Sequence, residues 1–176
     1  MTDSSWADPS GIAAGRGVSP GIDVHLVHGD LLDQHVDALV NPWNRNFVPR
    51  WLLRPGGVSG QLKRRTGPKP WRELRRCGTL AVGEAVITDG GLLPVDLIHV
   101  AGINAWWRAS VSSVALSTHS VVVAGWKAGY RSLAMPLIGS GHGSLSSEVS
   151  LRTIQGALGE YANSERAMLV IVVLHS

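Results

Sequence analysis

Residues 22–44 read IDVHLVHGDLLDQHVDALVNPWN, and this stretch carries the pattern that decides the fold. Its first part, Ile22–His28, alternates well enough between apolar and polar residues to predict a β-strand. A short apolar run follows at Val36–Val40 and predicts a second strand that stops at Pro42. Because both faces of this second strand look apolar, we expect it to lie centrally in a sheet that helices flank.

Strands and helices alternate along the rest of the chain. Further strands are expected at Ala85–Thr88, Leu97–Ala101, Ser132–Pro136 and Met168–Leu174. Helices are expected from Val58 to a stop at Gly67-Pro68, over Ser112–Ala128 with Gly129 ending it, and from a cap at Ser146 or Ser147 to about Ala162. This order predicts one α/β domain over residues 21–176, with a mixed, mostly parallel sheet covered by helices on both faces. Residues 1–20 are rich in Gly, Ser and Pro and are expected to form a flexible arm.

Charge and hydropathy limit the classes of partner. The 176 residues carry a formal charge of only +3, so nucleic acid is not an expected partner. The basic run Lys63-Arg64-Arg65 fits the last turn of a helix, where it complements the helix dipole, with a nucleic-acid patch as the alternative. No apolar run approaches the roughly 20 residues of a membrane helix, and the N-terminus lacks a secretory pattern. A cytoplasmic location without membrane contact is therefore expected.

The cysteine and the histidines point to no redox or metal chemistry. Cys77 is the one cysteine, so an internal disulfide is excluded, and we expect a small buried side chain rather than a reactive thiol. The seven histidines show no metal-ligand spacing, and no metal is expected. His25 and His99 lie within predicted strands, where we expect them to be packed or hydrogen-bonded.

Three loops follow predicted strands, where open α/β sheets bind their ligands. The first is Gly29-Asp30-Leu31, in which the Asp30 carboxylate can accept a hydrogen bond from an exocyclic amine such as that of adenine, or can cap a turn. The second contains Asn44, whose side chain suits a ribose diol, and Gly56-Gly57-Val58-Ser59 at a helix N-terminus, which suits a phosphate. The third is Gly139–Gly143, a nest of amides that includes Ser140, Gly141 and His142. Two glycine loops suggest a diphosphate ligand.

The order of these pieces resembles the macrodomain family. The residues that carry the resemblance are Val27-His28-Gly29-Asp30-Leu31, Val36–Asn41, Asn44, Gly56-Gly57-Val58, Gly60, Cys77, Gly83-Glu84-Ala85, Thr88, Ile98-His99-Val100 and Met135–Ile138. The resemblance implies a three-layer α/β/α fold with a cleft for ADP-ribose and no cofactor. It implies that Asp30 holds adenine, that Gly56–Ser59 and Gly139–Gly143 hold the diphosphate, and that Asn44 holds the distal ribose.

The same resemblance implies an activity. The expected function is an ADP-ribosyl hydrolase that removes ADP-ribose from acidic side chains of mono-ADP-ribosylated proteins. The alternatives are a reader that binds ADP-ribose without turnover and an O-acetyl-ADP-ribose deacetylase. The residues expected to position ribose and water, or to carry a proton, are Asn44, Gly57, Ser59 and His142, although His142 can equally be a solvent-facing loop residue.

The chain also departs from the family pattern. Pro42 and Trp43 stand between the two asparagines, where small residues are usual, so Trp43 either approaches the distal ribose or plugs the core. Ser59 and Gly143 stand where branches of the family carry Asp, so the usual general bases are absent. Leu174 and His175 occupy the place of an aromatic that stacks on adenine, and Trp106-Trp107 either flanks the adenine or covers the sheet.

Overall fold

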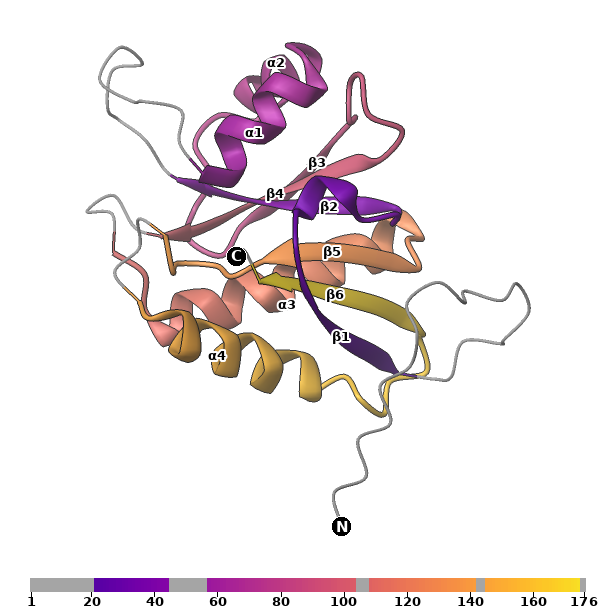
Figure 1. Ribbon diagram of the computed structural model, residues 1–176, viewed down its shortest axis with the longest axis vertical. Helices are drawn as coiled ribbons and strands as arrows, with labels where there is room; N and C mark the ends of the chain where they lie inside the picture. The colour runs from indigo at the N-terminus through magenta and orange to yellow at the C-terminus, as the bar shows by residue number, and fades with distance from the viewer. Residues whose placement is uncertain (1–20, 45–56, 104–107, 142–144, 175–176) are drawn as a thin grey trace.

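A computed structural model describes residues 21–44, 57–103, 108–141 and 145–174 of the chain. They form one six-stranded sheet with helices on both faces, so the prediction of a three-layer α/β/α fold is confirmed (Figure 1). The strands lie in the order β1-β6-β5-β2-β4-β3. Their bounds are β1 Ile22–His28, β2 Ala38–Asn44, β3 Ala85–Thr88, β4 Asp96–Ile103, β5 Ser132–Pro136 and β6 Met168–Leu174.

The sheet is mixed but mostly parallel, as the sequence predicted. β1, β6, β5, β2 and β4 pair in parallel, and only the short edge strand β3 pairs antiparallel, with β4. β2 lies between β5 and β4, and its residues Ala38, Leu39 and Val40 are almost fully buried. A run without a polar face suits this place because helices cover both sides of the strand.

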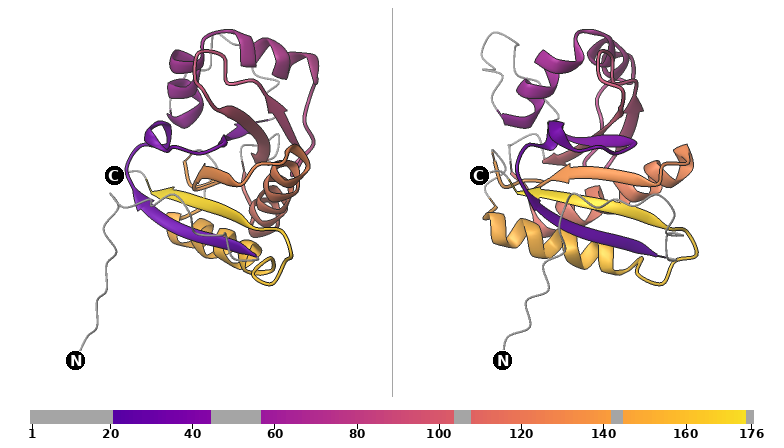
Figure 2. Two further views of the ribbon diagram at one scale, coloured as in Figure 1. Left: turned by 90° about the vertical axis from the view of Figure 1, so that its right-hand side faces the viewer. Right: turned by 45° about the vertical axis from the view of Figure 1, so that its right-hand side comes forward.

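Each face of the sheet has its own core. Ala38 and Val40 of β2 pack in the cluster beneath α3 (Val111–Ala128) and α4 (Ser147–Gly159). Leu39, between them, packs in the cluster beneath the short helix η1 (Leu31–Asp33), α1 (Gly57–Thr66) and α2 (Lys69–Arg76). The alternation follows from the period of two residues in a strand. Figure 2 shows the α3–α4 layer and the α1–α2 layer on opposite sides of the sheet.

The longest helix has the termini that the sequence indicated. Ser110 caps α3 by accepting a hydrogen bond from the amide of Ser113, and Gly129 ends the helix in a left-handed conformation with φ of 81°. Val114, Val121 and Val122 form its buried face. No helix in the described part of the chain is long and apolar enough to cross a membrane.

The sequence predicted that the second strand stops at Pro42, and this prediction was wrong. β2 continues through Pro42 to Asn44. β5 pairs with β2 only at Ala38 and Leu39, so among the described strands Pro42 has a neighbour on one side alone, β4, and proline is tolerated in strands with such an open side.

The segment after Gly67-Pro68 forms a helix that the sequence did not predict. These residues end α1, but a further helix, α2, starts at Lys69 because proline is well accommodated in a first helical turn. Cys77 is the C-terminal cap of α2 and is exposed, so the prediction that its side chain is buried was wrong. The last helix is also shorter than expected, since α4 ends at Gly159 and not near Ala162.

Candidate functional site

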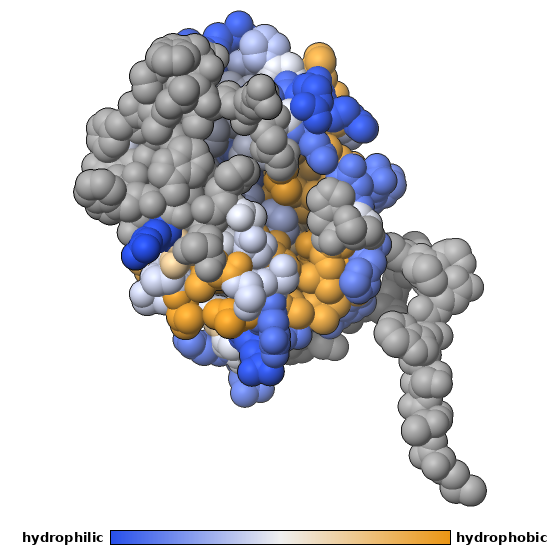
Figure 3. Space-filling view, turned by 60° about the vertical axis from the view of Figure 1, so that its left-hand side comes forward, coloured by the Kyte–Doolittle hydropathy of each residue, from blue (hydrophilic) through white to orange (hydrophobic). Residues whose placement is uncertain are grey.

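The predicted site loops meet at the carboxyl edge of the sheet. Asp30 follows β1, the loop that starts at Leu137 follows β5, and α1 begins at Gly57, with residues 45–56 between it and the end of β2. Paired strands lie about 4.8 Å apart, so in the order β1-β6-β5-β2 the strands β1 and β2 are three spacings, or about 14 Å, apart where they are paired across the sheet. The glycine loop after β5 lies between them. This arrangement suits an elongated ligand with its phosphates in the middle. Figure 3 views this face and shows apolar surface between polar rims.

Asp30 caps the helix η1. Its Oδ1 accepts a hydrogen bond from the amide of Leu32 at 2.9 Å, which supports the cap that the sequence offered as an alternative. The carboxylate is exposed, and Oδ2 has no hydrogen-bond partner within the described residues. One oxygen thus fixes the turn while the other is available to a donor. The side chain of Leu31 is buried in the core, so only its main chain can face a ligand.

A chain of hydrogen bonds joins the start of α1 to the buried sheet. The Ser59 hydroxyl donates to Oδ1 of Asn41 at 2.7 Å, with the Pro42 carbonyl oxygen at 3.3 Å. The Asn41 amide nitrogen lies 2.8 Å from Nδ1 of His99, and Nε2 of His99 lies 2.9 Å from the Thr88 hydroxyl. An amide nitrogen only donates, so Nδ1 accepts, and the neutral His99 donates from Nε2 to Thr88.

Burial keeps His99 neutral. The side chains of Asn41 and His99 are fully buried, and burial lowers the pKa of His99 from 6.5 to about 4. The prediction that His99 is packed and hydrogen-bonded is confirmed. His99 therefore orients Asn41, and Asn41 in turn fixes Ser59. Since the one hydroxyl proton of Ser59 points to acceptors within β2, Ser59 can offer a ligand only its lone pairs.

Trp43 belongs to an aromatic cluster on the α1–α2 face of the sheet. Its ring lies 5.7 Å from that of Trp71 and 6.5 Å from that of His99. Nζ of Lys63 lies 5.4 Å from the Trp43 centroid and 4.9 Å from the Trp71 centroid, within range for cation–π attraction. Trp43 is half-buried against the core, which favours the core alternative over the distal ribose.

The loop after β5 contains two described glycines with different roles. Gly139 has a φ of 82°, and a Cβ there would lie 2.5 Å from that of Ala109, so the fold itself needs glycine. Gly141 is exposed, and a Cβ there would meet no atom of the described residues within 4 Å. The Ser140 hydroxyl donates to the carbonyl oxygen of Leu137 at 3.3 Å. A ligand approaching the main chain gives a reason for glycine at 141 that packing does not.

Several predicted site residues lie outside the described part of the chain. They are the side chain of Asn44 together with Gly56, His142 and Gly143. Trp106 and Trp107 also lie outside it, as do residues 1–20. Gly57 is the first residue of α1, and Val58 and Ser59 follow in its first turn, as predicted.

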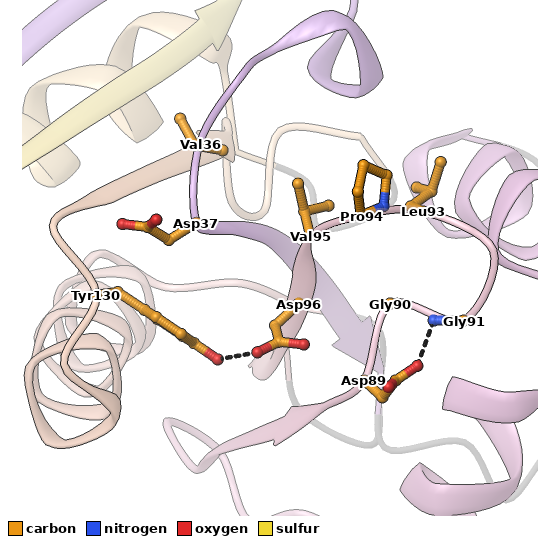
Figure 4. A pocket seen from close by; sticks show the side chains of 10 residues that line it. All are labelled: Val36, Asp37, Asp89, Gly90, Gly91, Leu93, Pro94, Val95, Asp96 and Tyr130. Atoms are coloured by element: carbon orange, nitrogen blue, oxygen red, sulfur yellow. Dashed lines mark hydrogen bonds between the residues drawn. The ribbon is translucent and has the colours of Figure 1, made fainter.

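A second hollow lies at the opposite, amino edge of the sheet. It has a volume of about 420 Å³ and contains Asp37, Asp89, Asp96 and Tyr130 (Figure 4). Tyr130 donates to Asp96 at 2.5 Å, and burial together with this carboxylate raises the pKa of Tyr130. The described residues contain no group of three or more His, Cys, Asp or Glu side chains that could hold a metal.

The sequence did not predict the polar chain or the helix α2. Asn41, Thr88 and His99 are polar residues in apolar strands, and the register pairs Asn41 with His99 on neighbouring strands. A polar residue recurring in each of three adjacent strands is a signal that would have found the chain, because buried polar groups need partners.

Comparison with known proteins agrees with this architecture. The family described as Macro domain matches residues 40–154. An O-acetyl-ADP-ribose deacetylase of Citrobacter rodentium is 31% identical over 160 residues, which cover 84% of this chain and 86% of the relative.

Two solved structures share the fold. The Oceanobacillus iheyensis macrodomain with ADP has a TM-score of 0.75 and 23% identity, covering 92% of this chain and 87% of that one. The Trypanosoma brucei macrodomain in complex with ADP-ribose has a TM-score of 0.65 and 24% identity, covering 85% and 63%. The family match spans well over half of the chain, and the sheet order and site loops accompany it. The chain therefore belongs to the macro domain family.

Proposed function

We propose that this chain binds ADP-ribose at the carboxyl edge of its sheet and hydrolyses the bond between ADP-ribose and acidic side chains of proteins. The observation that carries the proposal is Gly141, an exposed glycine in the loop that follows β5, at the carboxyl edge of the sheet, where a Cβ would meet no atom of the described residues within 4 Å. It lies in a loop between Asp30 on one side and the end of β2 on the other. The relatives support the ligand, since solved macrodomains hold ADP-ribose or ADP.

The proposed ligand follows the order of the strands. Adenine lies by the free oxygen of Asp30, the diphosphate lies against the main chain of Gly139–Gly143 and of Gly56–Ser59, and the distal ribose lies by Asn44. Free amides at the start of α1 favour negative charge there. This order gives each part of the ligand a group of matching chemistry.

The reaction needs little acid–base strength from the protein. The bond between a side-chain carboxylate and the anomeric carbon of ribose is an ester-like acylal. A water attacks the anomeric carbon, the carboxylate leaves with the bonding electrons, and a phosphate oxygen of the substrate takes the proton of the water. Asn44, Gly57 and Gly141 position ribose and water, amides of the loops stabilise the arrangement, and His142 is the candidate proton carrier.

Ser59 favours a second candidate, a reader that binds ADP-ribose without turnover. A neutral serine hydroxyl is a very weak base, so Ser59 cannot replace an acidic residue in that role, and its own proton is directed to Asn41 and Pro42. A third candidate, deacetylation of O-acetyl-ADP-ribose, is supported by the name of the Citrobacter relative. We propose a cytoplasmic location as well, with which the exposed and unpaired thiol of Cys77 is compatible.

The test uses a variant that blocks the site without disturbing the fold. Gly141→Glu places a bulky anion in open space where the diphosphate is expected, and Gly156→Glu is the matched control, because a Cβ at Gly156 on α4 also meets no atom within 4 Å. The substrate is a protein mono-ADP-ribosylated on Glu or Asp, and O-acetyl-ADP-ribose is assayed in parallel. Calorimetry with free ADP-ribose measures binding separately.

The outcomes separate the candidates. Release of ADP-ribose by the native protein and by Gly156→Glu, but not by Gly141→Glu, supports the hydrolase. Acetate release with the same dependence, without protein de-ADP-ribosylation, makes the chain a deacetylase. ADP-ribose binding without either turnover makes it a reader. If the native protein does not bind ADP-ribose, the proposed site is wrong.

A further inference from the structure

Charge is distributed very unevenly over this chain. Seven of its 16 Lys and Arg residues lie within residues 57–76, together with one of its 13 Asp and Glu residues. In the rest of the chain acidic residues outnumber basic ones, twelve to nine. The whole-chain charge of +3 therefore hides a strongly basic α1–α2 segment on an otherwise slightly acidic protein.

The structure places this charge at exposed positions of two adjacent helices. α1 and α2 are adjacent and lie on the same side of the sheet (Figures 1 and 2). Their apolar faces are buried, with Leu62 on α1 and Trp71 and Leu74 on α2. The arginines of the two helices are all exposed; they are Arg64, Arg65, Arg72, Arg75 and Arg76. We call these five residues the arginine surface.

The arginine surface has no acidic partner among the described residues. Lys69 pairs with Asp89 at 2.7 Å, and Lys63 lies over two tryptophan rings, so both of these cations are engaged. None of the five arginines forms a salt bridge with a residue that the structure describes. A helix C-terminus carries a partial charge of about −0.5, so the two helix dipoles account for only part of this accumulation.

We infer that the arginine surface binds the phosphate backbone of a nucleic acid. Guanidinium groups match phosphate oxygens in two-point hydrogen bonds, and five exposed arginines on two adjacent helices offer contacts to several phosphates of a strand. A membrane fits less well, because the apolar faces of both helices are used in the core and cannot insert into lipid. Arg64 and Arg65 lie seven and eight residues, or about 10–12 Å, along α1 from Gly57, so they are at the opposite end of the helix from the proposed ADP-ribose site.

The expected binding is sensitive to salt. If the five arginines contact five phosphates of duplex DNA, the slope of log affinity against log salt is about −4.5, which is about a 500-fold loss between 50 and 200 mM. Fluorescence anisotropy of the full chain with a labelled duplex of about 20 base pairs measures this slope. A single-stranded RNA of equal length is titrated beside it.

Two charge-matched variants test the surface. The α2 variant carries Arg72→Gln, Arg75→Gln and Arg76→Gln, and it leaves about two contacts and a loss of only about 12-fold over the same salt range. The control carries Lys127→Gln, Arg131→Gln and Arg166→Gln, three exposed basic residues on another part of the protein, and it is expected to keep the native slope. Arg64→Gln with Arg65→Gln on α1 is a second test, which removes about 1.8 from the slope. Thermal unfolding and ADP-ribose affinity of all variants are measured and are expected to match the native protein.

Several results would overturn the inference. They are the absence of binding at 50 mM salt, equal slopes for the α2 variant and the control, and displacement of the DNA by poly-glutamate at an equal concentration of charges. The last result would assign the surface to acidic proteins instead. Since ADP-ribose binding is measured in the same samples, failure here is distinct from failure of the proposed function.

Discussion

The buried imidazole of His99 makes a specific prediction about stability and pH. Its pKa is about 4 in the folded protein because of burial, against 6.5 for an exposed histidine. Between these two values the unfolded chain binds up to one more proton than the folded chain. The free energy of unfolding therefore falls as the pH falls from about 6.5 to 4. Above pH 6.5 the protein has the full stability that goes with a neutral His99. A difference of 2.5 pKa units corresponds to about 3 kcal/mol.

Urea denaturation at pH values from 7.5 to 4 measures the effect, and two variants isolate it. His99→Gln has no titrating group, so its deficit relative to the native protein should shrink by about 3 kcal/mol as the pH falls. Thr88→Val removes the acceptor of the His99 hydrogen bond but keeps the imidazole, so its curve should run below the native curve and parallel to it. If the His99→Gln curve is also parallel to the native curve, His99 is not held neutral by the fold and the reasoning fails.

Two other positions give predictions of the same kind, both read from urea denaturation. Asp37 accepts hydrogen bonds from the amide of Arg131 at 2.7 Å and from the amide and hydroxyl of Ser132, so Asp37→Asn should lower the free energy of unfolding by about 1–3 kcal/mol. An equal effect of Asp33→Asn, at an exposed carboxylate of η1, would contradict this. Gly139→Ala should cost about 2 kcal/mol, because φ is 82° and the new Cβ would clash. Its comparison is Gly141→Ala, where the expected cost is below about 0.5 kcal/mol, and similar costs for the two would remove the distinction drawn between them.

The strands and the longest helix could be predicted because local signals and tertiary context agree there. β1, β5 and β6 have the bounds that hydrophobic patterns indicated, and Gly129 ends α3 as expected of a left-handed cap. These segments are apolar in the positions that the sheet buries. Periodicity and turn chemistry therefore report the same structure.

Two of the errors arose at prolines, because the tertiary context decides whether a proline ends a secondary-structure element. Pro42 continues a strand because, among the described strands, only β4 pairs with it there, which depends on the length of β5. Pro68 separates two helices instead of ending the helical region. Cys77 was expected to be buried as free cysteines usually are, but it lies exposed at the end of α2. The polar chain from Ser59 to Thr88 depends on strand register, which a single sequence does not supply.

The site predictions divide in the same way. Glycine-rich loops after strands could be found from the sequence, and the structure brings the described parts of those loops to one edge of the sheet. The hydrogen bonds that each side chain makes at this edge could not be predicted from the sequence. Ser59 is a catalytic candidate because of its place after Gly57-Val58, and the structure adds that its proton is directed into the sheet; its catalytic role stays a prediction. The roles assigned to Asn44 and His142 stay predictions.

The pairing of β1 with β6 bears on how the protein is made. Ile22 lies beside Met168, so the first and last strands of the sheet are neighbours although 146 positions separate these two residues. Closing such a long loop is slow. During synthesis on the ribosome, β1 is made first and stays unpaired until β6 has been made. Asp30 is held at the sheet edge by this pairing, through the Gly29 amide and the Leu174 carbonyl oxygen. A nascent chain therefore acquires the Asp30 end of its cleft only after residues 168–174 have been translated and released.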